Sequence, residues 1–423
     1  MRRRVVVTGM GCVTPLGAEL EQVWQRLTEG QSGIGPITLF DASNFPVRIA
    51  AEVRDWDISE VGEPTERWED QPRHTTFVIA AAKKAVRSAG LEDARIDPLR
   101  FGVSLGCGET YPDFAQFGQL MAVAVGSGRF ESETFVRTSL ENGRSGSGVL
   151  WELNAPAYYL AGMFDAQGPN ANYTAACVSS SQAAGEAGEV IRRGEADVML
   201  AGGAHSMIHP FGLTGFHRLS VLSVRNDQTA MRPFDRDRDG FVIGEGAGIV
   251  VLEELEHARN RKAEIWGELA GYGSAQNAFR ITDSHPEGRG ISDCIERALD
   301  DAQLNPDQID YINAHGTGTV ENDRVETLGI KKVFGPKAYR VPISSTKSMV
   351  GHLTTACGAL DLIVSLMTLR TGVVHPTINY ETPDPECDLD YVPNVARQVP
   401  SKHVLSNSFG FGGQNVALVV SCY

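Results

Sequence analysis

Short apolar runs alternate with amphipathic stretches along this chain, which is the pattern of strands followed by helices. Residues 198–201 and 249–252 are continuously apolar, as strands are when helices cover both faces of a mainly parallel sheet. After Cys177, small and apolar residues recur at helical spacing, and Gly194 ends this predicted helix just after two arginines. The apolar positions of that helix are Ala183, Ala184, Ala187, Val190 and Ile191. The alternation predicts an α/β fold.

The second half of the chain repeats the pattern of the first. Residues 85–97 and 298–310 match at five small, apolar or acidic positions, at a constant offset of 213 residues. In both copies an amphipathic helix leads through a polar turn into a strand, and each half ends with a glycine-rich segment before an apolar strand. A repeat of this length indicates two copies of one domain rather than a solenoid. We predict two halves, 1–255 and 256–423, linked near the charged helix 253–262.

Reactive side chains gather where strands of the two halves are predicted to end. Cys177 lies there in the first half, and His315, Lys347 and His352 follow two strands of the second. Ligands of α/β proteins bind at such strand ends, and the glycines beside each histidine allow close approach. A thiol at a helix start meets unpaired N–H groups that favour the thiolate, although a buried structural cysteine explains the segment around Cys177 equally well. The two histidines and the lysine opposite it favour a nucleophile. Histidines without such a setting are interpreted as structural or solvated: His205, His209, His217, His257, His285 and His403.

Composition narrows the class of protein. With 423 residues the chain can hold two large cores, and its net charge of −15 argues against nucleic acid as the main partner. Seven scattered cysteines without a CxxC pair fit a reducing cytoplasm better than a zinc or disulfide scaffold. No run approaches the ~20 apolar residues of a membrane span. We expect no metal and no dinucleotide, because Thr14 replaces the third glycine of a dinucleotide loop and Gly246 replaces the glutamate of a calcium loop.

Together these motifs resemble the β-ketoacyl-acyl-carrier-protein synthases of the elongating, decarboxylating kind, within the thiolase-fold superfamily. The resemblance runs from residue 5 to residue 419, and its long motifs occur in the family's order: 196–204, 232–235, 238–248, 313–319, 345–352 and 407–413. It implies a thiolase-like layered αβαβα fold built from two duplicated halves. It also implies a homodimer that acts in fatty acid, lipid or polyketide synthesis, and the cysteine pattern adds a cytoplasmic location. No cofactor is implied, because the substrates are carried on the phosphopantetheine of an acyl carrier protein.

The resemblance also implies roles for individual residues. Cys177 would receive the acyl chain from a thioester, with its own N–H and that of Phe411 as oxyanion hole. His315 and His352 would bind the malonyl thioester carbonyl as an enolate forms, while Lys347 organises the decarboxylation pocket. Supporting residues are Asp323 and Glu326 for the loop of His315, Phe411 as a gate with Phe409 beneath it, and Thr317 and Thr319 as hydrogen-bond partners of the pantetheine arm.

Several segments depart from the family pattern. The Phe-Pro-rich stretch expected within 107–165 is replaced by residues 140–153, in a region that lines the acyl pocket and dimer contact of the family. The acyl length and shape therefore stay open, and a specialised lipid or polyketide pathway is an alternative to straight fatty acids. Ala175 and Gln414 also depart from the pattern, but neither change removes a catalytic group.

The predicted surface for the carrier protein has few basic residues, although an acidic carrier needs them near the pocket mouth. Only Arg73 matches the family's basic run, with Arg67, Arg218 and Arg225 as further candidates, and each fits a solvated face equally well. Thiolases carry a second cysteine and initiating synthases an asparagine where this chain has histidines and a lysine. Chain-length partner subunits lose the nucleophile that this chain retains. A non-catalytic or specialised partner subunit with a vestigial Cys177 is the alternative from another functional class.

Overall fold

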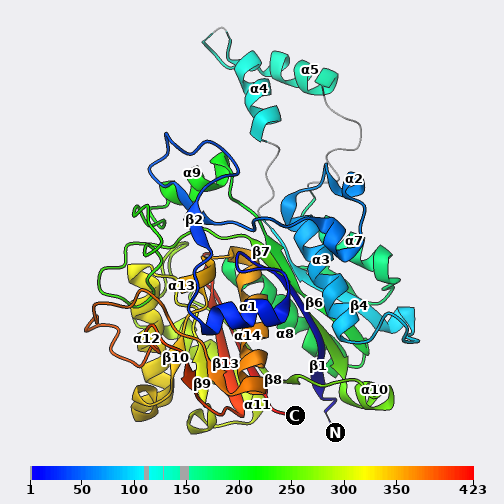
Figure 1. Ribbon diagram of the computed structural model, residues 1–423, viewed down its shortest axis with the longest axis vertical. Helices are drawn as coiled ribbons and strands as arrows, with labels where there is room; N and C mark the ends of the chain where they lie inside the picture. Colours follow the sequence, from blue (N-terminus) through cyan, green and yellow to red (C-terminus); the bar gives the residue numbers. More distant parts are fainter. Residues whose placement is uncertain (1, 109–113, 127, 143–151) are drawn as a thin grey trace.

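A large mixed sheet forms the centre of the chain (Figure 1). The computed structural model describes residues 2–108, 114–126, 128–142 and 152–423. Within them, ten strands are ordered β10-β9-β13-β14-β8-β1-β7-β6-β4-β5. Strands of the first half are β1 (Val5–Val13), β4 (Phe101–Gly106), β5 (Asn170–Asn172), β6 (Val198–His205) and β7 (Gly246–Glu254). Strands of the second half are β8 (Gly267–Gln276), β9 (Tyr311–Asn313), β10 (Ile343–Ser344), β13 (His403–Phe409) and β14 (Gln414–Ser421).

The sheet shows the predicted duplication directly. Read outward from the junction of β1 and β8, the orders β1-β7-β6-β4-β5 and β8-β14-β13-β9-β10 are equivalent. In each series the first two pairings are antiparallel and the last two are parallel. The duplicated fold is therefore confirmed. The boundary at residue 255, where α10 (Leu255–Asn260) follows β7, stays a prediction.

Equivalent helices cover the two halves of the sheet. On the outside, α3 (Arg73–Ser88) packs on β1 and α11 (Arg289–Ala302) packs on β8. A Cβ atom added at Gly9 or Gly11 of β1 would collide with the backbone of α3, and one at Gly271 or Gly273 of β8 would collide with that of α11. The glycines that imitate a dinucleotide loop thus serve close helix–strand packing.

Two further helices form the middle layer, between the five strands of the first half and the five strands of the second. α8 (Ser179–Arg192) packs on β4 and β6, and α14 (Cys357–Thr371) packs on β7 and β13. They also contact each other, because Gly358 leaves room for Ser181. With α7 (Ala155–Phe164) and α12 (Val320–Phe334) in the outer layers beside α3 and α11, the predicted layered αβαβα fold is confirmed. Further helices and strands of the body are α1 (Leu20–Thr28), β2 (Ile34–Pro36), β3 (Ile49–Ala51), α2 (Thr65–Trp68), α9 (Pro210–Arg218), α13 (Lys347–Val350), β11 (Val373–Val374) and β12 (Arg397–Gln398).

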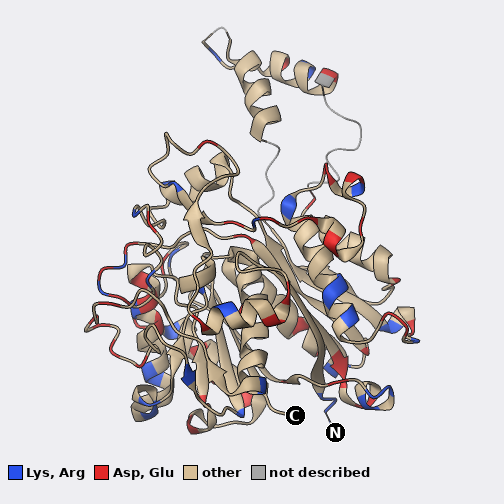
Figure 2. Cartoon of the chain, viewed as in Figure 1, with Lys and Arg blue, Asp and Glu red and all other residues tan. Residues whose placement is uncertain are grey.

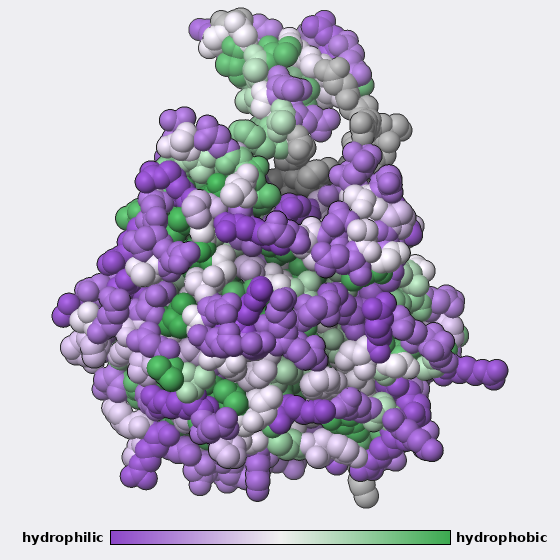
Figure 3. Space-filling view, viewed as in Figure 1, coloured by the Kyte–Doolittle hydropathy of each residue, from purple (hydrophilic) through white to green (hydrophobic). Residues whose placement is uncertain are grey.

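Two helices, α4 (Phe114–Ala124) and α5 (Ser132–Asn142), project from the body (Figure 1). α4 contains no charged residue (Figure 2), and the projecting pair displays apolar residues on its surface (Figure 3). Phe114 and Phe117 stack edge-to-face on Phe211 of α9, with centroids 4.9 and 5.3 Å away. Much of the unfamiliar stretch 140–153 lies outside the described residues. In the described part of the chain, no helix has the length and apolar character needed to cross a membrane.

Candidate active site

The strand ends of both halves meet at a cavity of about 300 Å³. Its wall includes Cys177 from the first half and His315 and His352 from the second. One potential ligand atom from each of these three side chains lies within 4.8 Å of the others, and all three residues are buried. The structure therefore brings together the thiol and the two imidazoles that the sequence singled out.

Cys177 occupies a tight turn just before α8. The turn is the 3-10 segment Ala176–Val178, so the thiol lies two residues ahead of the α-helix rather than in its first turn. Ala176 has a φ of +49°, a left-handed conformation that its small side chain tolerates at modest cost. The hydroxyl of Ser179 accepts the Ala175 N–H at 2.9 Å and donates to the Ala176 carbonyl at 2.7 Å, which fixes the turn. Local backbone geometry thus presents Cys177 at the cavity wall.

Glu326 holds the loop that carries His315. Its two carboxylate oxygens accept the backbone N–H groups of His315 and Gly316, each at 2.8 Å. Burial raises the pKa of Glu326 to about 7, against the opposing effect of these N–H groups. Asp323 supports the same loop by accepting the N–H of Gly318 at 3.2 Å and faces the Arg238 guanidinium at 3.6 Å. Both acidic residues therefore lie where the sequence analysis expected them.

The two histidines are positioned as neutral hydrogen-bond donors. Burial lowers the pKa of each well below its ordinary value of 6.5, and the nearby Lys347 charge lowers it further. Their rings are nearly perpendicular, with centroids 5.4 Å apart. Nδ1 of His352 accepts the backbone N–H of Thr354 at 3.2 Å, so the proton of the neutral ring resides on Nε2.

Lys347 is buried as half of an ion pair. Its ammonium donates to Oδ2 of Asp361 in α14 at 2.9 Å, and both side chains are at most 2% exposed. Burial alone would lower the pKa of Lys347, but the Asp361 carboxylate, together with Cys357 and Glu326, raises it above the ordinary value. Lys347 is consequently a fixed positive charge rather than a nucleophile.

Sequence reasoning missed several residues beneath the site. Asp361 is the single acidic residue of α14, a helix made mostly of apolar residues, and that isolation was an available signal. His375 is fully buried and contacts the hydroxyls of Tyr311, Ser344 and Thr346 at 3.2 to 3.4 Å. His205 is also fully buried and lies against the turn that follows His352.

The other expected site residues also line the cavity. Phe409 lies edge-to-face on His315, with centroids 5.6 Å apart, and Phe411 forms part of the wall. A Cβ atom on Gly410 would lie 3.5 Å from the Cys177 nitrogen, so this loop runs close to the thiol. The Thr317 and Thr319 hydroxyls are 2.9 Å apart at the wall, and that of Thr319 also caps α12.

The candidate carrier-binding arginines are in different environments. Arg218 is exposed beside Leu219 and Ser220, which line the cavity. Arg73 is engaged with the buried Glu245 at 2.6 Å and lies over Phe77. Arg67 stacks on Trp68, and Arg225 donates to the Asp237 carbonyl at 2.9 Å. Arg218 is therefore the arginine best placed at the cavity mouth, where the acidic residues Asp239, Asp283 and Glu321 also lie.

The thiol and imidazoles are donors that Zn²⁺ also accepts, so a metal site needs consideration. A metal-bound histidine retains its other ring N–H and donates it to an acceptor. His352 has the opposite arrangement, because its Nδ1 accepts an N–H, and Lys347 adds positive charge nearby. The geometry fits hydrogen-bond donation to an anion better than metal coordination.

Comparisons with known proteins agree with this site. The N-terminal domain model of the β-ketoacyl synthases matches residues 2–258, and the C-terminal domain model matches residues 266–381. The chain is 42% identical to the 3-oxoacyl-[acyl-carrier-protein] synthase 2 of Coxiella burnetii, over 99% of both chains. It is also 42% identical to the enzyme of that name from Synechocystis, over 100% of this chain and 99% of the other.

Comparison with solved structures also finds ketosynthases as similar proteins. One match is to the structure of a type II polyketide acyl-carrier protein in complex with its ketosynthase. It has a TM-score of 0.89, 34% identity and full coverage of both chains. A β-ketoacyl synthase from Burkholderia phymatum matches with a TM-score of 0.88 and 33% identity, again over both full chains. The resemblance seen in the motifs is confirmed: the chain belongs to the β-ketoacyl synthase family of condensing acyltransferases.

Proposed function

We propose that this chain transfers an acyl group from a thioester to Cys177 and condenses it with malonyl-acyl-carrier protein to give a 3-oxoacyl thioester. The observation that supports this most is the meeting of Cys177, His315 and His352 in one cavity, beside the buried Lys347 charge. Both substrates would arrive on the phosphopantetheine of a carrier protein, so the reaction needs no resident cofactor.

In the first step the Cys177 sulfur attacks the thioester carbonyl. A new carbon–sulfur bond forms, the bond to the phosphopantetheine sulfur breaks, and that thiol leaves with the proton of Cys177. The N–H groups of Cys177 and Phe411 would bind the oxyanion, and the closeness of Gly410 to Cys177 favours this pairing. Donors fixed in this way contribute a factor of roughly 100 to 1000 in rate.

In the second step the malonyl thioester loses CO2. The carbon–carboxylate bond breaks, and its electron pair moves into an enolate whose oxygen would accept N–H groups from His315 and His352. Because both rings are buried and neutral, each carries one ring N–H, which it can donate to the developing negative charge while keeping its proton. The enolate carbon then attacks the acyl carbonyl, and the Cys177 sulfur leaves as a thiolate that takes a proton from solvent.

Intact-mass spectrometry tests the first step. Incubation with an acyl thioester should add one acyl group, and Cys177→Ala should abolish the adduct. Cys422→Ala, at an exposed cysteine remote from the cavity wall, is the matched control and should keep it. If no chain length from a panel of acyl thioesters gives an adduct, the non-catalytic partner subunit is the better account.

The length and type of the acyl chain are also part of this proposal. The cavity of about 300 Å³ has room for a short acyl group. Fatty acid and polyketide enzymes are both among the relatives. The same mass assay across chain lengths distinguishes them: rapid loading of long straight chains supports fatty acid synthesis. Loading restricted to short or functionalised chains supports a specialised pathway.

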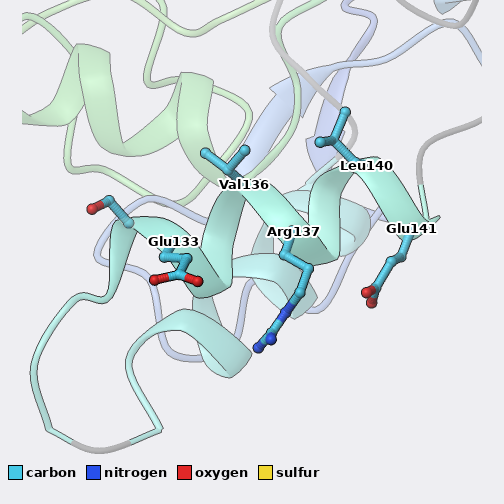
Figure 4. A pocket seen from close by; sticks show the side chains of 6 residues that line it. Glu133, Val136, Arg137, Leu140 and Glu141 are labelled. Atoms are coloured by element: carbon cyan, nitrogen blue, oxygen red, sulfur yellow. The ribbon is translucent and has the colours of Figure 1, made fainter.

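We further propose a cytoplasmic homodimer that contacts an acyl carrier protein near Arg218. α5 carries Val136 and Leu140 on one side and charged residues on the other, beside a shallow hollow (Figure 4). Val136 is 53% and Leu140 79% exposed, which is unfavourable for a monomer in water and favours a second copy on this face. Arg218→Glu should weaken turnover of carrier-bound substrate but spare self-acylation by a small free thioester.

A further inference from the structure

The turn that follows His352 is attached to the end of β6 by two consecutive threonines. Thr354 hydrogen-bonds through its hydroxyl to Nδ1 of His205, the last residue of β6. The Thr355 hydroxyl donates to the carbonyl of Ala204 at 2.8 Å. All of these side chains are buried. The hydrogen bond between His205 and Thr354 joins residues that are 149 positions apart in sequence.

Thr354 adopts a conformation that β-branched residues rarely take. Its φ is +32°, in the left-handed region where the Cβ atom crowds the backbone. Such a residue persists only where its surroundings hold it. The equivalent turn of the first half has Ala176 at a φ of +49°, a smaller side chain that needs less restraint. The hydrogen bond to His205 is a restraint of the required kind.

This conformation directs the Thr354 N–H back toward the His352 ring. The N–H donates to Nδ1 at 3.2 Å, while the His352 backbone is fixed by hydrogen bonds to Val242 at 2.8 Å and Gly244 at 3.0 Å. Acceptance at Nδ1 requires that the neutral ring carry its proton on Nε2. If Thr354 relaxed, the ring could take the other tautomer, whose Nε2 lone pair would repel an enolate oxygen.

We propose that His205 is a positioning residue: it anchors Thr354 in its left-handed conformation and thereby fixes His352 in the tautomer that donates to the enolate. This inference rests on the role proposed above for His352. It assigns a function to a histidine whose sequence context gave no indication of one.

Paired variants test the anchor. His205→Phe keeps a ring but removes the hydrogen bond, whereas His205→Asn places an amide near the position of Nδ1. Thr354→Ala removes the hydroxyl, whereas Thr354→Gly removes it but adopts a left-handed φ without strain. We expect His205→Phe and Thr354→Ala to slow malonyl decarboxylation roughly tenfold to a hundredfold, less than the roughly 100- to 1000-fold loss for removing an oriented donor outright. His205→Asn and Thr354→Gly should recover most of that loss.

Two further measurements separate positioning from general damage. Thr355→Ala removes the neighbouring hydroxyl but leaves the hydrogen bond from the Thr354 N–H to His352 in place, so it should change the rate of decarboxylation little. Self-acylation of Cys177 should persist in every variant. In 15N-histidine-labelled protein, with the His352 signal assigned by its absence in His352→Ala, Nδ1 should be unprotonated in the wild type. It should become partly protonated in His205→Phe and Thr354→Ala.

Each outcome decides one point. If His352→Ala decarboxylates at the wild-type rate, the role of His352 in the proposed function is wrong. If His352→Ala is slow but His205→Phe retains both the wild-type rate and the wild-type tautomer, only the His205 anchor is overturned. Should His205→Phe fail to fold, equal rates for Thr354→Ala and Thr354→Gly would overturn it instead.

Discussion

Asp361 shows how a single side chain sets the electrostatics of the site. Without it, the buried Lys347 ammonium would have no opposite charge within hydrogen-bond distance on α14. Its carboxylate keeps Lys347 protonated, and the resulting positive charge helps to keep His315 and His352 neutral. The pair thus acts on both histidines through the charge of Lys347.

We expect Asp361→Asn to destabilise the fold by about 3 to 5 kcal/mol, the range for leaving one member of a buried ion pair uncompensated. Thermal unfolding measures the loss. The double variant Lys347→Met/Asp361→Leu should recover much of the stability while remaining inactive. A single variant as stable as the wild type would show that the buried charge is compensated elsewhere.

Residues with local signals were predictable, and those acting through distant contacts were not. Cys177, His315, Lys347 and His352 lie in glycine-rich or helix-start motifs that are readable along the chain. Their assigned roles stay predictions. The anchor between His205 and Thr354 joins positions 149 residues apart, and no periodicity or spacing reveals such a contact.

At the scale of elements, the strands and helices followed from the apolar pattern because their periodicity is local. α8 ends at Arg192, and Gly194 has a φ of +77°, as the sequence indicated. Cys177 differed: the sequence placed it at the helix start, but a left-handed Ala176 forces a separate turn before α8. Backbone strain of this kind has no signature in composition.

Close packing between α3 and β1 predicts the effect of enlarging a glycine. Gly11→Ala would push a Cβ atom into the Ala81 carbonyl, and overpacking of this kind costs about 1 to 3 kcal/mol. Chemical denaturation should show that loss. Gly215→Ala, at an exposed position of α9 with no atom near the added Cβ, is the control and should be neutral or slightly stabilising.

Glu326 on α12 predicts a pH-dependent difference in stability. Because burial raises its folded-state pKa to about 7 from an ordinary 4.5, the folded chain binds a proton that the unfolded chain releases between these values. Its contribution to the free energy of unfolding is therefore present at low pH and lost as pH rises from about 4.5 through 7, by roughly 3 kcal/mol.

The free energy of unfolding is measured for the wild type and for Glu326→Gln at each pH, and the second value is subtracted from the first. This difference isolates the contribution of Glu326 from those of the buried histidines, which change with pH in the opposite direction. The difference should decrease as pH rises through this window. A difference that is constant with pH would show that Glu326 is ionised at its ordinary pKa.

At the scale of the molecule, the duplication explains why the site is composite. Each half supplies the same strand-to-helix turn, but the first places Cys177 there and the second places His315, Lys347 and His352 around it. Neither half alone contains the full set. The repeat was visible in sequence, whereas the projecting α4 and α5 were not predicted, since their apolar side chains lie outside the core of the body.

The exposed face of α5 predicts self-association. Leu140→Glu should convert a dimer into a monomer in light scattering coupled to size-exclusion chromatography, because it puts a charge into an apolar contact. Glu141→Gln, next to it on the charged side of α5, is the control and should stay dimeric. A wild-type chain that is monomeric at micromolar concentration would contradict the proposed interface.

The most direct test of the central claim is a single-turnover condensation. Protein whose Cys177 has been acylated is mixed with malonyl-acyl-carrier protein labelled in the free carboxylate, and labelled CO2 and the 3-oxoacyl product are measured together. We predict both in equal amounts, with His315→Ala and His352→Ala each at least a hundredfold slower, about the effect of losing an oxyanion donor. Acylated wild-type protein that releases neither CO2 nor product would contradict the account.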